Sequence, residues 1–230
     1  MIGFNWDVIW RHRDEFVLGL VLGLKMAVIG LIIASIIGLL LAFARTSRHR
    51  WLSVPATAYI EFIRNIPLLL ILLTIYFGVP MWAFKSLPDS VADIVVLDDK
   101  NSFIAALSIY GAAYLAEVFR AGIQSVSKRY VEAGRSLGLS GFEVARYITL
   151  PIMFRTVLPS LSNTFISLFK DTSIAMAIGV PELTFVTRKL VTDTFQYIEA
   201  WTVAGAIYLI TVFGIAWVLR YLERRIRWSV

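Results

Sequence analysis

Long blocks of apolar residues with almost no charge constrain this chain more than any other feature of its sequence. A spanning helix needs roughly 20 mostly apolar residues. Five segments meet that requirement, at about residues 16–44, 55–79, 103–121, 159–178 and 200–219. Inside a bilayer the backbone must satisfy its own hydrogen bonds, so segments of this length are expected to be helical. The sequence therefore predicts an all-α integral membrane protein with five transmembrane helices.

The composition agrees with this assignment and narrows the chemistry. Hydrophobic residues make up 58% of the chain and charged residues only 17%, a balance that water-soluble domains rarely have. The chain has no cysteine, and its two histidines, His12 and His49, lie far apart in the sequence. We therefore expect neither a disulfide nor a bound metal ion.

The distribution of lysine and arginine predicts the orientation of the helices, because cytoplasmic segments carry an excess of both. Basic clusters without a comparable number of acids follow the first, third and fifth spans: Arg45, Arg48 and Arg50; Lys128, Arg129, Arg135 and Arg146; Arg220, Arg224, Arg225 and Arg227. Residues 80–100, between the second and third spans, are acidic on balance. This alternation predicts an N-terminus outside and a C-terminus inside, and it explains the net charge of +6 without a nucleic-acid partner.

The segment between the third and fourth spans, about residues 125–151, is polar yet patterned. Apolar residues alternate with charged ones, and Gly138 and Gly141 mark the middle. Ser140 followed three residues later by Glu143 predicts a capping box at the start of a helix. We expect two short amphipathic helices joined by a turn. A loop that forms its own helices beside a membrane is expected to dock a partner.

The same loop carries a spaced motif. Glu132-Ala133-Gly134 is followed by three residues, Gly138, nine residues and Ile148-Thr149-Leu150-Pro151. This arrangement resembles the EAA loop, E-A-A-x3-G-x9-I-x-L-P, of the permease subunits of ATP-binding-cassette importers. Every spacing matches, and Gly134 departs from the pattern by replacing its second alanine.

Most of the remaining chain is similar to the polar amino acid branch of that family. The matching residues fall in the predicted second, third and fourth spans: Tyr59, Glu61, Arg64 and Pro67–Leu69; Tyr114, Ala116, Glu117 and Arg120–Ile123; Leu158, Pro159, Asn163, Lys170–Ser173, Gly179, Val180, Glu182 and Leu183. At Asn65-Ile66 the branch usually has Gly-Thr, and the outer loop at residues 81–100 departs in length and composition.

The resemblance implies a transmembrane permease subunit of an ATP-driven importer for polar amino acids, multi-pass in a bacterial plasma (inner) membrane. The implied partners are a second permease chain, identical or different, two cytoplasmic ATP-binding subunits and an external solute-binding protein. The sequence contains no phosphate loop of the form G-x4-G-K-[ST]. We therefore expect no enzymatic activity and no cofactor in this chain, with ATP and Mg²⁺ held by the partner ATPase.

On this resemblance, the loop would sit in a groove of the ATPase subunit and move with it. The helix around Glu132 to Leu137 would act as a lever, Gly138 would permit a close turn, and Pro151 would end the loop where the fourth span begins. The residues expected to couple the two subunits are Glu132, Ala133, Gly134, Leu137, Gly138, Ile148, Leu150 and Pro151.

Charged side chains in the predicted fourth span mark a candidate solute path, since each costs about 2.5–3.5 kcal/mol in a bilayer on insertion scales. Lys170 and Asp171 point about 100° apart and are poorly placed to pair with each other. They could instead flank a cavity that complements the carboxylate and ammonium of an amino acid. Thr172, Ser173 and Asn163 could add neutral hydrogen bonds.

A purely structural role for these charges stays open, for example through pairing of Asp171 with Lys25 or Arg64. Glu61 and Arg64 share a face of the second span, and their spacing predicts an ion pair. These two residues could also line the path or act as a gate, although a plain salt bridge is the simpler interpretation.

Three further expectations concern packing. Glu117 and Arg120 are spaced for an ion pair in the third span, and Pro67 is expected to kink the second. Small residues in the first span are spaced for close helix packing: Gly19, Gly23, Gly30, Ala34 and Gly38. One domain, residues 1–230, is the simplest organisation.

Two other functions compete with this interpretation. An ATP-independent secondary transporter or channel would usually show inverted repeats or charges on several pore-lining helices, and neither is evident. A membrane enzyme would need a cluster of His, Asp or Cys at one membrane face, which the sequence does not indicate.

Overall fold

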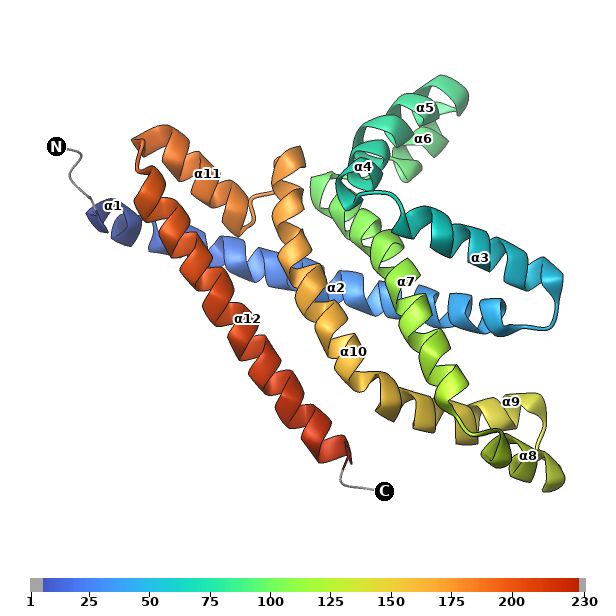
Figure 1. Ribbon diagram of the computed structural model, residues 1–230. Coiled ribbons are helices and arrows are strands. Elements are labelled where there is room, and N and C mark those ends of the chain that lie inside the picture. Colours follow the sequence, from blue (N-terminus) through green and yellow to red (C-terminus); the bar gives the residue numbers. More distant parts are fainter. Residues whose placement is uncertain (1–5, 228–230) are drawn as a thin grey trace.

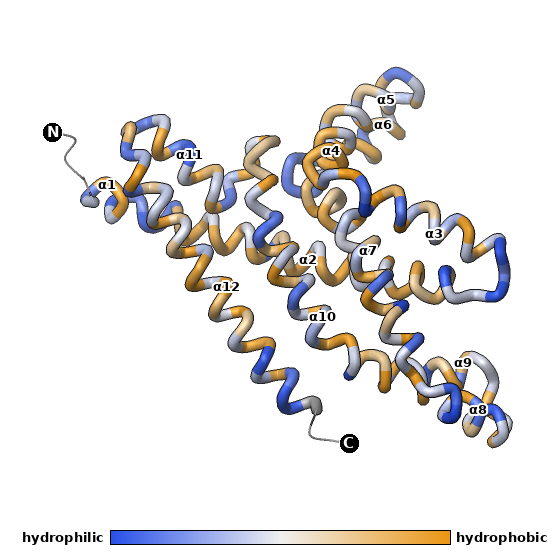
Figure 2. Tube along the Cα trace, in the orientation of Figure 1, coloured by the Kyte–Doolittle hydropathy of each residue, from blue (hydrophilic) through white to orange (hydrophobic). Residues whose placement is uncertain are grey.

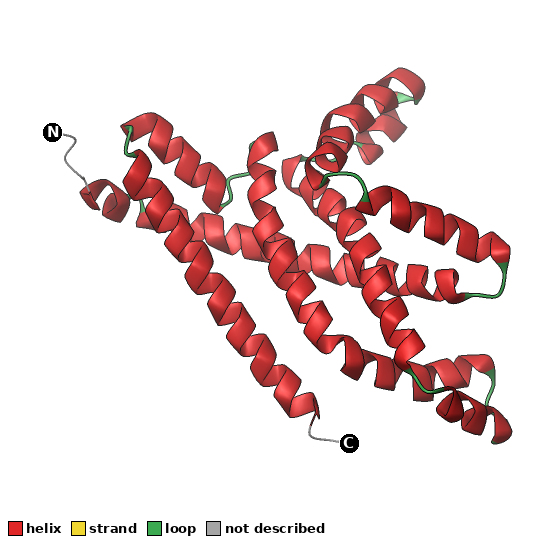
Figure 3. Ribbon diagram, in the orientation of Figure 1, coloured by secondary structure: helices red, strands yellow, loops and turns green. Residues whose placement is uncertain are grey.

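The computed structural model describes residues 6–227, so the two ends of the predicted domain, residues 1–5 and 228–230, lie outside the described part (Figure 1). Within it, only helices and loops occur (Figure 3). The elements in chain order are α1 Trp6–Arg11, α2 Arg13–Thr46, α3 Arg50–Arg64, α4 Leu68–Leu73, π-helix η1 Thr74–Gly78, α5 Val79–Ser86, α6 Asp89–Val95, α7 Asp99–Ser125, α8 Lys128–Ser136, α9 Gly141–Val144, π-helix η2 Ala145–Thr149, α10 Leu150–Asp171, 3-10 helix η3 Thr172–Ile178, α11 Leu183–Thr194 and α12 Tyr197–Arg227.

Four helical runs are long and apolar enough to cross a membrane: Arg13–Thr46, Leu68–Ser86, Asp99–Ser125 and Tyr197–Arg225. Three of these runs expose many large apolar side chains, for example Leu209, Ile210, Phe213 and Trp217 of α12, whereas Asp99–Ser125 is mostly buried. Figure 2 shows hydrophobic residues along most of α12, with hydrophilic residues gathered toward its C-terminal end. Such a surface fits contact with lipid or with other membrane helices rather than with water.

The fourth predicted span, residues 159–178, is not among these four runs. Helix α10 begins earlier, at Leu150, and the regular helix ends at Asp171, after which the chain continues as the 3-10 helix η3. Polar residues such as Arg155, Ser162 and Asn163 lie among the apolar residues of α10, and Lys170 and Asp171 lie at its end.

The second predicted span, residues 55–79, is wrong as one continuous helix. Helix α3 ends at Arg64, and the chain turns through Asn65 and Ile66 before Pro67 caps the start of α4. Proline disfavours a helical conformation at the residue before it and cannot donate a backbone hydrogen bond. The expected kink at Pro67 is therefore a complete break between two helices.

Helices α2 and α7 form the most extensive packing pair, and α2 crosses behind α7 and α10 in Figure 1. The five small residues predicted to pack in the first span are all buried in α2. A methyl group added at Gly38 would lie 2.9 Å from Leu115 Cβ, and one added at Gly30 would lie 2.8 Å from a Leu107 methyl carbon. The predicted role of these residues in close packing is confirmed.

Two π-helical turns, η1 and η2, each precede a proline. Each turn ends two residues before a proline: η1 before Pro80 and η2 before Pro151. A proline has no backbone N–H and cannot donate a hydrogen bond to the carbonyl one turn earlier. In a π turn that carbonyl accepts instead from a residue one position later in the chain. Helices α9, η2 and α10 consequently form one continuous bent run, so Pro151 lies within helix α10 and does not separate the loop from the following helix.

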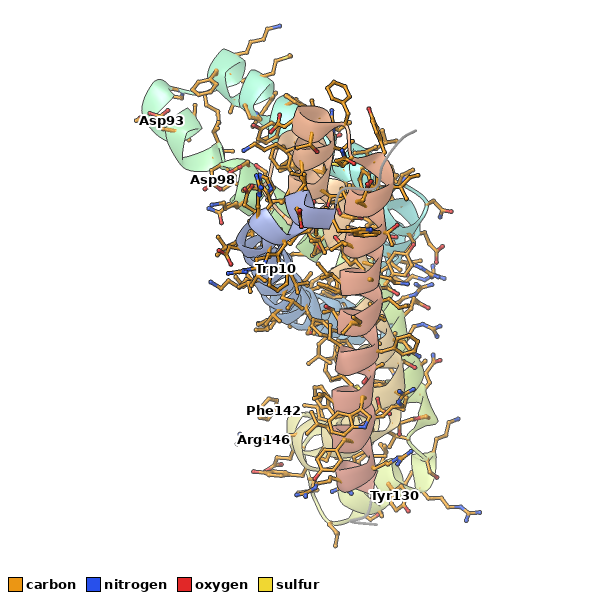
Figure 4. All side chains as sticks on the ribbon, turned by 90° about the vertical axis from the view of Figure 1, so that its left-hand side faces the viewer. Trp10, Asp93, Asp98, Tyr130, Phe142 and Arg146 are labelled. Atoms are coloured by element: carbon orange, nitrogen blue, oxygen red, sulfur yellow. The ribbon has the colours of Figure 1, made fainter. Side chains whose placement is uncertain are left out.

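The two ends of the molecule differ in charge. In Figure 4, Asp93 and Asp98 lie near one end, while Tyr130 and Arg146 lie near the other. The basic segment that follows α7 therefore lies away from the acidic segment before α7, and Arg45 in the last turn of α2 pairs with Glu117 in the second half of α7. This separation supports the expected alternation of the loops, and the direction of the chain in a membrane stays a prediction.

Candidate functional site

The patterned loop folds as a helical hairpin of α8 and α9. Helix α8 ends in two hydrogen bonds, from Gly138 N to Arg135 O at 2.9 Å and from Leu139 N to Gly134 O at 3.1 Å. Gly138 has φ +82°, the left-handed conformation in which glycine carries no steric penalty. The sequence of the loop thus fixes its own turn.

The second loop helix begins with the predicted capping box, which is confirmed. Glu143 N donates to Ser140 Oγ at 3.3 Å, and Ser140 N donates to Glu143 Oε2 at 2.8 Å. The hydrogen bond from the Ser140 side chain, with that from its backbone, lowers the pKa of the Glu143 carboxyl. The carboxylate therefore keeps its charge, and the cap its second hydrogen bond, until the pH falls below the usual range of a glutamate.

The inner face of the hairpin is a small apolar contact centred on Gly134. This glycine is buried, and a methyl group added to it would lie 2.5 Å from Ile148 Cδ1. Ile148 thus occupies the space that the second alanine of the EAA pattern would fill. Val144 and Leu139 lie at 3.4 and 3.5 Å from the same point. The packing of the hairpin therefore explains why glycine replaces alanine at position 134.

The outer face of the hairpin exposes large apolar side chains. Leu137 is 82% exposed, Phe142 72%, Tyr147 63% and Tyr130 59%. The expected coupling residues Glu132 and Ala133 are also exposed. Figure 4 shows Tyr130, Phe142 and Arg146 gathered at this end of the molecule. An apolar patch on a short polar loop is typical of a surface that another protein covers.

The remaining coupling candidates connect the hairpin to the helix bundle. Leu150 is partly buried and packs against the cluster that contains Phe119 and Met153. Pro151 is exposed in the first turn of α10. The loop is thereby joined to the bundle through a helix rather than through a flexible linker.

A polar cavity of about 390 Å³ lies between α7 and α10. Its lining residues are Tyr110, Tyr114, Asn163, Thr164, Ser167, Leu168 and Asp171. Tyr110 donates a hydrogen bond to the Tyr114 hydroxyl at 3.2 Å. The Arg64 guanidinium lies 5.4 Å from the centre of the Tyr114 ring, close enough for a cation–π contact. The cavity thus combines a carboxylate, an amide and hydroxyl groups beside one arginine.

The structure brings together only part of the predicted path. Asn163 and Asp171 line the cavity, whereas Lys170 is exposed outside its lining. Thr172 is buried, donates to Phe169 O at 2.7 Å and lies against Gly23 of α2. Ser173, which is partly buried, is not a lining residue either.

The predicted ion pairs are half correct. Glu117 and Arg120 pair within α7 at 2.8 Å, as their spacing indicates. Glu61 instead pairs with Arg45 of α2 at 3.1 Å, and the predicted Glu61–Arg64 pair is wrong. The end of α2 lies close enough to α3 for Arg45 to reach Glu61, while Arg64 turns toward Tyr114.

The alternative pairing of Asp171 is not present among the described residues. Its carboxylate makes no ion pair with Lys25 or Arg64. Lys25 is exposed on α2 within a shallow apolar hollow. Asp171 therefore faces the cavity without a fixed counter-ion from the part of the chain that the structure describes.

The sequence-based prediction of the path missed five residues that line the cavity: Tyr110, Tyr114, Thr164, Ser167 and Leu168. A detectable signal existed, because Asn163, Ser167 and Asp171 are spaced at i, i+4 and i+8 and so share one face of α10. Tyr110 and Tyr114 follow the same rule on α7.

Known proteins are similar to this chain along nearly its whole length. Residues 18–228 match the family described as "Binding-protein-dependent transport system inner membrane component". The glutamine transport system permease protein GlnP of Escherichia coli K12 is 36% identical over 224 residues, covering 97% of this chain and 98% of GlnP. The octopine transport system permease protein OccM of Rhizobium radiobacter is 34% identical, covering 96% of this chain and 89% of OccM.

Solved structures show the same fold. A chain from the crystal structure of an amino acid ABC transporter with histidines is 31% identical and superimposes with a TM-score of 0.84, covering 97% of this chain and 100% of that chain. A chain of the MetNI methionine ABC transporter superimposes with a TM-score of 0.76 at 16% identity, covering 94% of this chain and 98% of its own length. The second likeness concerns the fold alone.

Proposed function

The chain belongs to the family of binding-protein-dependent transport system inner membrane components, and from this premise we propose that it carries polar amino acids into the cell. It is the multi-pass membrane component of an ATP-binding-cassette importer in the inner membrane. The observation that carries the proposed substrate class is the 36% identity to a glutamine permease over nearly the full length of both chains.

The chemistry of the cavity supports an amino acid as the solute. Asp171 supplies a negative charge for an ammonium group, and Arg64, stacked near Tyr114, supplies a positive charge within reach of the same region. Asn163 and Ser167 add groups that both donate and accept hydrogen bonds. A zwitterion with a polar side chain is complementary to this set, whereas an apolar solute would leave it unpaired.

For the topology, we propose five crossings with the N-terminus outside and the C-terminus inside. The second crossing is the broken run α3 to α5, and the fourth is the run α10 to η3. Buried packing of α10 against α7 and α2 supports its position inside the bundle. The charge of Asp171 is tolerated there because its side chain faces a polar cavity rather than lipid.

For energy coupling, we propose that the α8–α9 hairpin docks into a separate ATPase subunit. The exposed Leu137 and Phe142 supply an apolar contact, and Glu132 supplies a charge on the same hairpin. The continuous helix from Gly141 to Asp171 then passes movement of the hairpin to the cavity. The proposed assembly contains a second permease chain, two ATPase subunits that hold ATP and Mg²⁺, and an external solute-binding protein.

The test is uptake by the assembled importer in proteoliposomes. Labelled glutamine, glutamate, arginine and histidine are supplied outside with the solute-binding protein, and ATP is enclosed with the ATPase subunits. Uptake of at least one of these amino acids that requires both ATP and the ATPase supports the proposal. Equal uptake by the chain alone would instead indicate an ATP-independent transporter, and uptake of none of them would remove the proposed substrate class.

A further inference from the structure

A second polar cavity, of about 620 Å³, lies where the ends of α2 and α7 meet the beginnings of α3 and α8. Three cationic side chains line it, Arg45, Arg120 and Lys128, and none of its lining residues is acidic. It is separate from the polar cavity between α7 and α10 and shares no lining residue with it.

The polar groups that line this cavity are rich in hydrogen-bond donors. Among the described residues, the hydroxyls of Ser53 and Thr57 and the Lys128 ammonium have no hydrogen-bond or ion-pair partner. Gln124 accepts from Arg120 Nη1 at 2.8 Å, which leaves its amide N–H groups free to donate. Donors that converge on one hollow without acceptors of their own are suited to an anion with several oxygen atoms.

The two arginines are held in place by carboxylates outside the cavity lining. Arg45 Nη1 contacts Glu117 at 2.5 Å and Arg120 Nη2 contacts it at 2.8 Å, while Arg45 Nη2 contacts Glu61 at 3.1 Å. Each terminal nitrogen of a guanidinium carries a second N–H, so these contacts do not exhaust the donors. Three cations against two carboxylates leave one net positive charge.

The position of the cavity indicates the source of the anion. Arg45 lies in the last turn of α2, and Gln124 lies in the last turn of α7, just before Lys128 begins α8. The cavity therefore lies at the ends of two candidate spanning helices, α2 and α7, and lipid headgroups lie at such ends. Trp51 and Val54, next to Ser53 on α3, are 72% and 61% exposed. They lie on a different face of α3 from Ser53 and Thr57, and they provide an exposed apolar surface for acyl chains at the start of the helix that lines the cavity.

We infer that this cavity, which we call the headgroup cavity (Arg45, Ser53, Thr57, Arg120, Gln124 and Lys128), binds a phosphate group, with an anionic phospholipid headgroup as the favoured source. Basic pockets between membrane helices at the cytoplasmic side bind such headgroups. Occupancy would tie α8, through Lys128, to α2 and α3. Free inorganic phosphate offers the same chemistry without the acyl chains.

The experiment uses the purified full-length chain, stripped of lipid in a neutral detergent and titrated with phosphatidylglycerol or phosphatidylcholine while native mass spectrometry counts bound lipid. Two variants probe the site, Lys128→Gln and Thr57→Val. The matched control is Arg129→Gln, which also removes one positive charge, but at a residue outside the cavity lining. Equilibrium dialysis with labelled inorganic phosphate distinguishes the second source.

We expect phosphatidylglycerol to bind more tightly than phosphatidylcholine, and Lys128→Gln to weaken its binding about fivefold, while Arg129→Gln has less than half that effect. Binding of inorganic phosphate that depends on Lys128, without preference for phosphatidylglycerol, supports the site with the other source. Equal binding of both lipids with no phosphate binding overturns the inference, as does an equal loss in the Lys128 and Arg129 variants. If Lys128→Gln fails to fold, the same comparison is decided by Thr57→Val.

Discussion

Arg45 and Glu117 join the last turn of α2 to α7 by an ion pair of 2.5 Å between residues 72 positions apart in the sequence. Both side chains are only 20% exposed, and Arg120 shares the same carboxylate. One carboxylate thus holds two guanidinium groups at the end of the bundle where the basic loops begin.

Replacing Glu117 by Gln is expected to destabilise the chain by about 2 kcal/mol, because two partly buried cations lose their shared counter-ion. Glu61→Gln is the matched control. Its carboxylate is 54% exposed and holds one of these arginines, so less than about 1 kcal/mol is expected. Denaturant unfolding in detergent measures both. Equal losses would show that the shared carboxylate has no special role.

Replacing Gly38 by Leu is expected to separate α2 from α7, because even its first side-chain carbon would lie 2.9 Å from Leu115 Cβ and 3.0 Å from Ala112 O. Overpacking of this kind typically costs about 1–3 kcal/mol. Gly205→Ala is the control, since a methyl group added there meets nothing within 4 Å. Thermal stability in detergent provides the comparison, and an unchanged Gly38 variant would contradict the observed packing.

Replacing Gly138 by Val is expected to uncouple ATP hydrolysis from uptake while the chain still reaches the membrane. A β-branched residue is strained at φ +82°, at a cost of about 1–2 kcal/mol, and the hairpin must change its turn. Gly141→Ala, with nothing within 4 Å of its added methyl group and no positive φ, serves as the control. Uptake and ATPase activity are measured together in proteoliposomes. Normal uptake by the Gly138 variant would argue against a coupling role, and the same applies to Glu132→Ala.

Replacing Leu137 by Ser is expected to weaken association with the ATPase subunit about tenfold or more, since burying a leucine side chain contributes about 1.5–3 kcal/mol. The control is Met81→Ser, which alters a side chain that is 74% exposed on α5, at the end of the molecule away from the hairpin (Figure 1). Association is measured by surface plasmon resonance on nanodiscs. A larger effect at Met81 than at Leu137 would indicate that the ATPase subunit binds the end of the molecule that carries α5, and it would contradict docking on the hairpin.

Replacing Asp171 by Asn is expected to lower uptake at least tenfold, because the cavity loses its negative charge. Lys170→Met, which alters an exposed neighbour outside the cavity lining, is expected to change uptake much less. Substrate-stimulated ATPase activity with the solute-binding protein present is the second readout. If the Asp171 variant fails to assemble in the membrane, its charge serves the structure rather than the path.

The candidate sites show which features were accessible from sequence. The capping box of Ser140 and Glu143 and the turn at Gly138 were predictable because their hydrogen bonds join residues close in the chain. The Glu117–Arg120 pair followed from helical spacing for the same reason. The Glu61–Arg64 prediction failed because Arg45, which lies nearer in space on another helix, takes the carboxylate.

The sequence by itself determined that the chain is helical, where its long apolar runs lie, how charge alternates between its loops, and how the α8–α9 hairpin is built. These features depend on local periodicity and on backbone hydrogen bonds within a few residues. Only the tertiary structure decided that Asp171 faces the cavity while Lys170 does not, that Arg45 meets Glu117, and that Ile148 fills the space above Gly134. Such contacts depend on the rotation and crossing of packed helices, which the side chains of several distant segments set together.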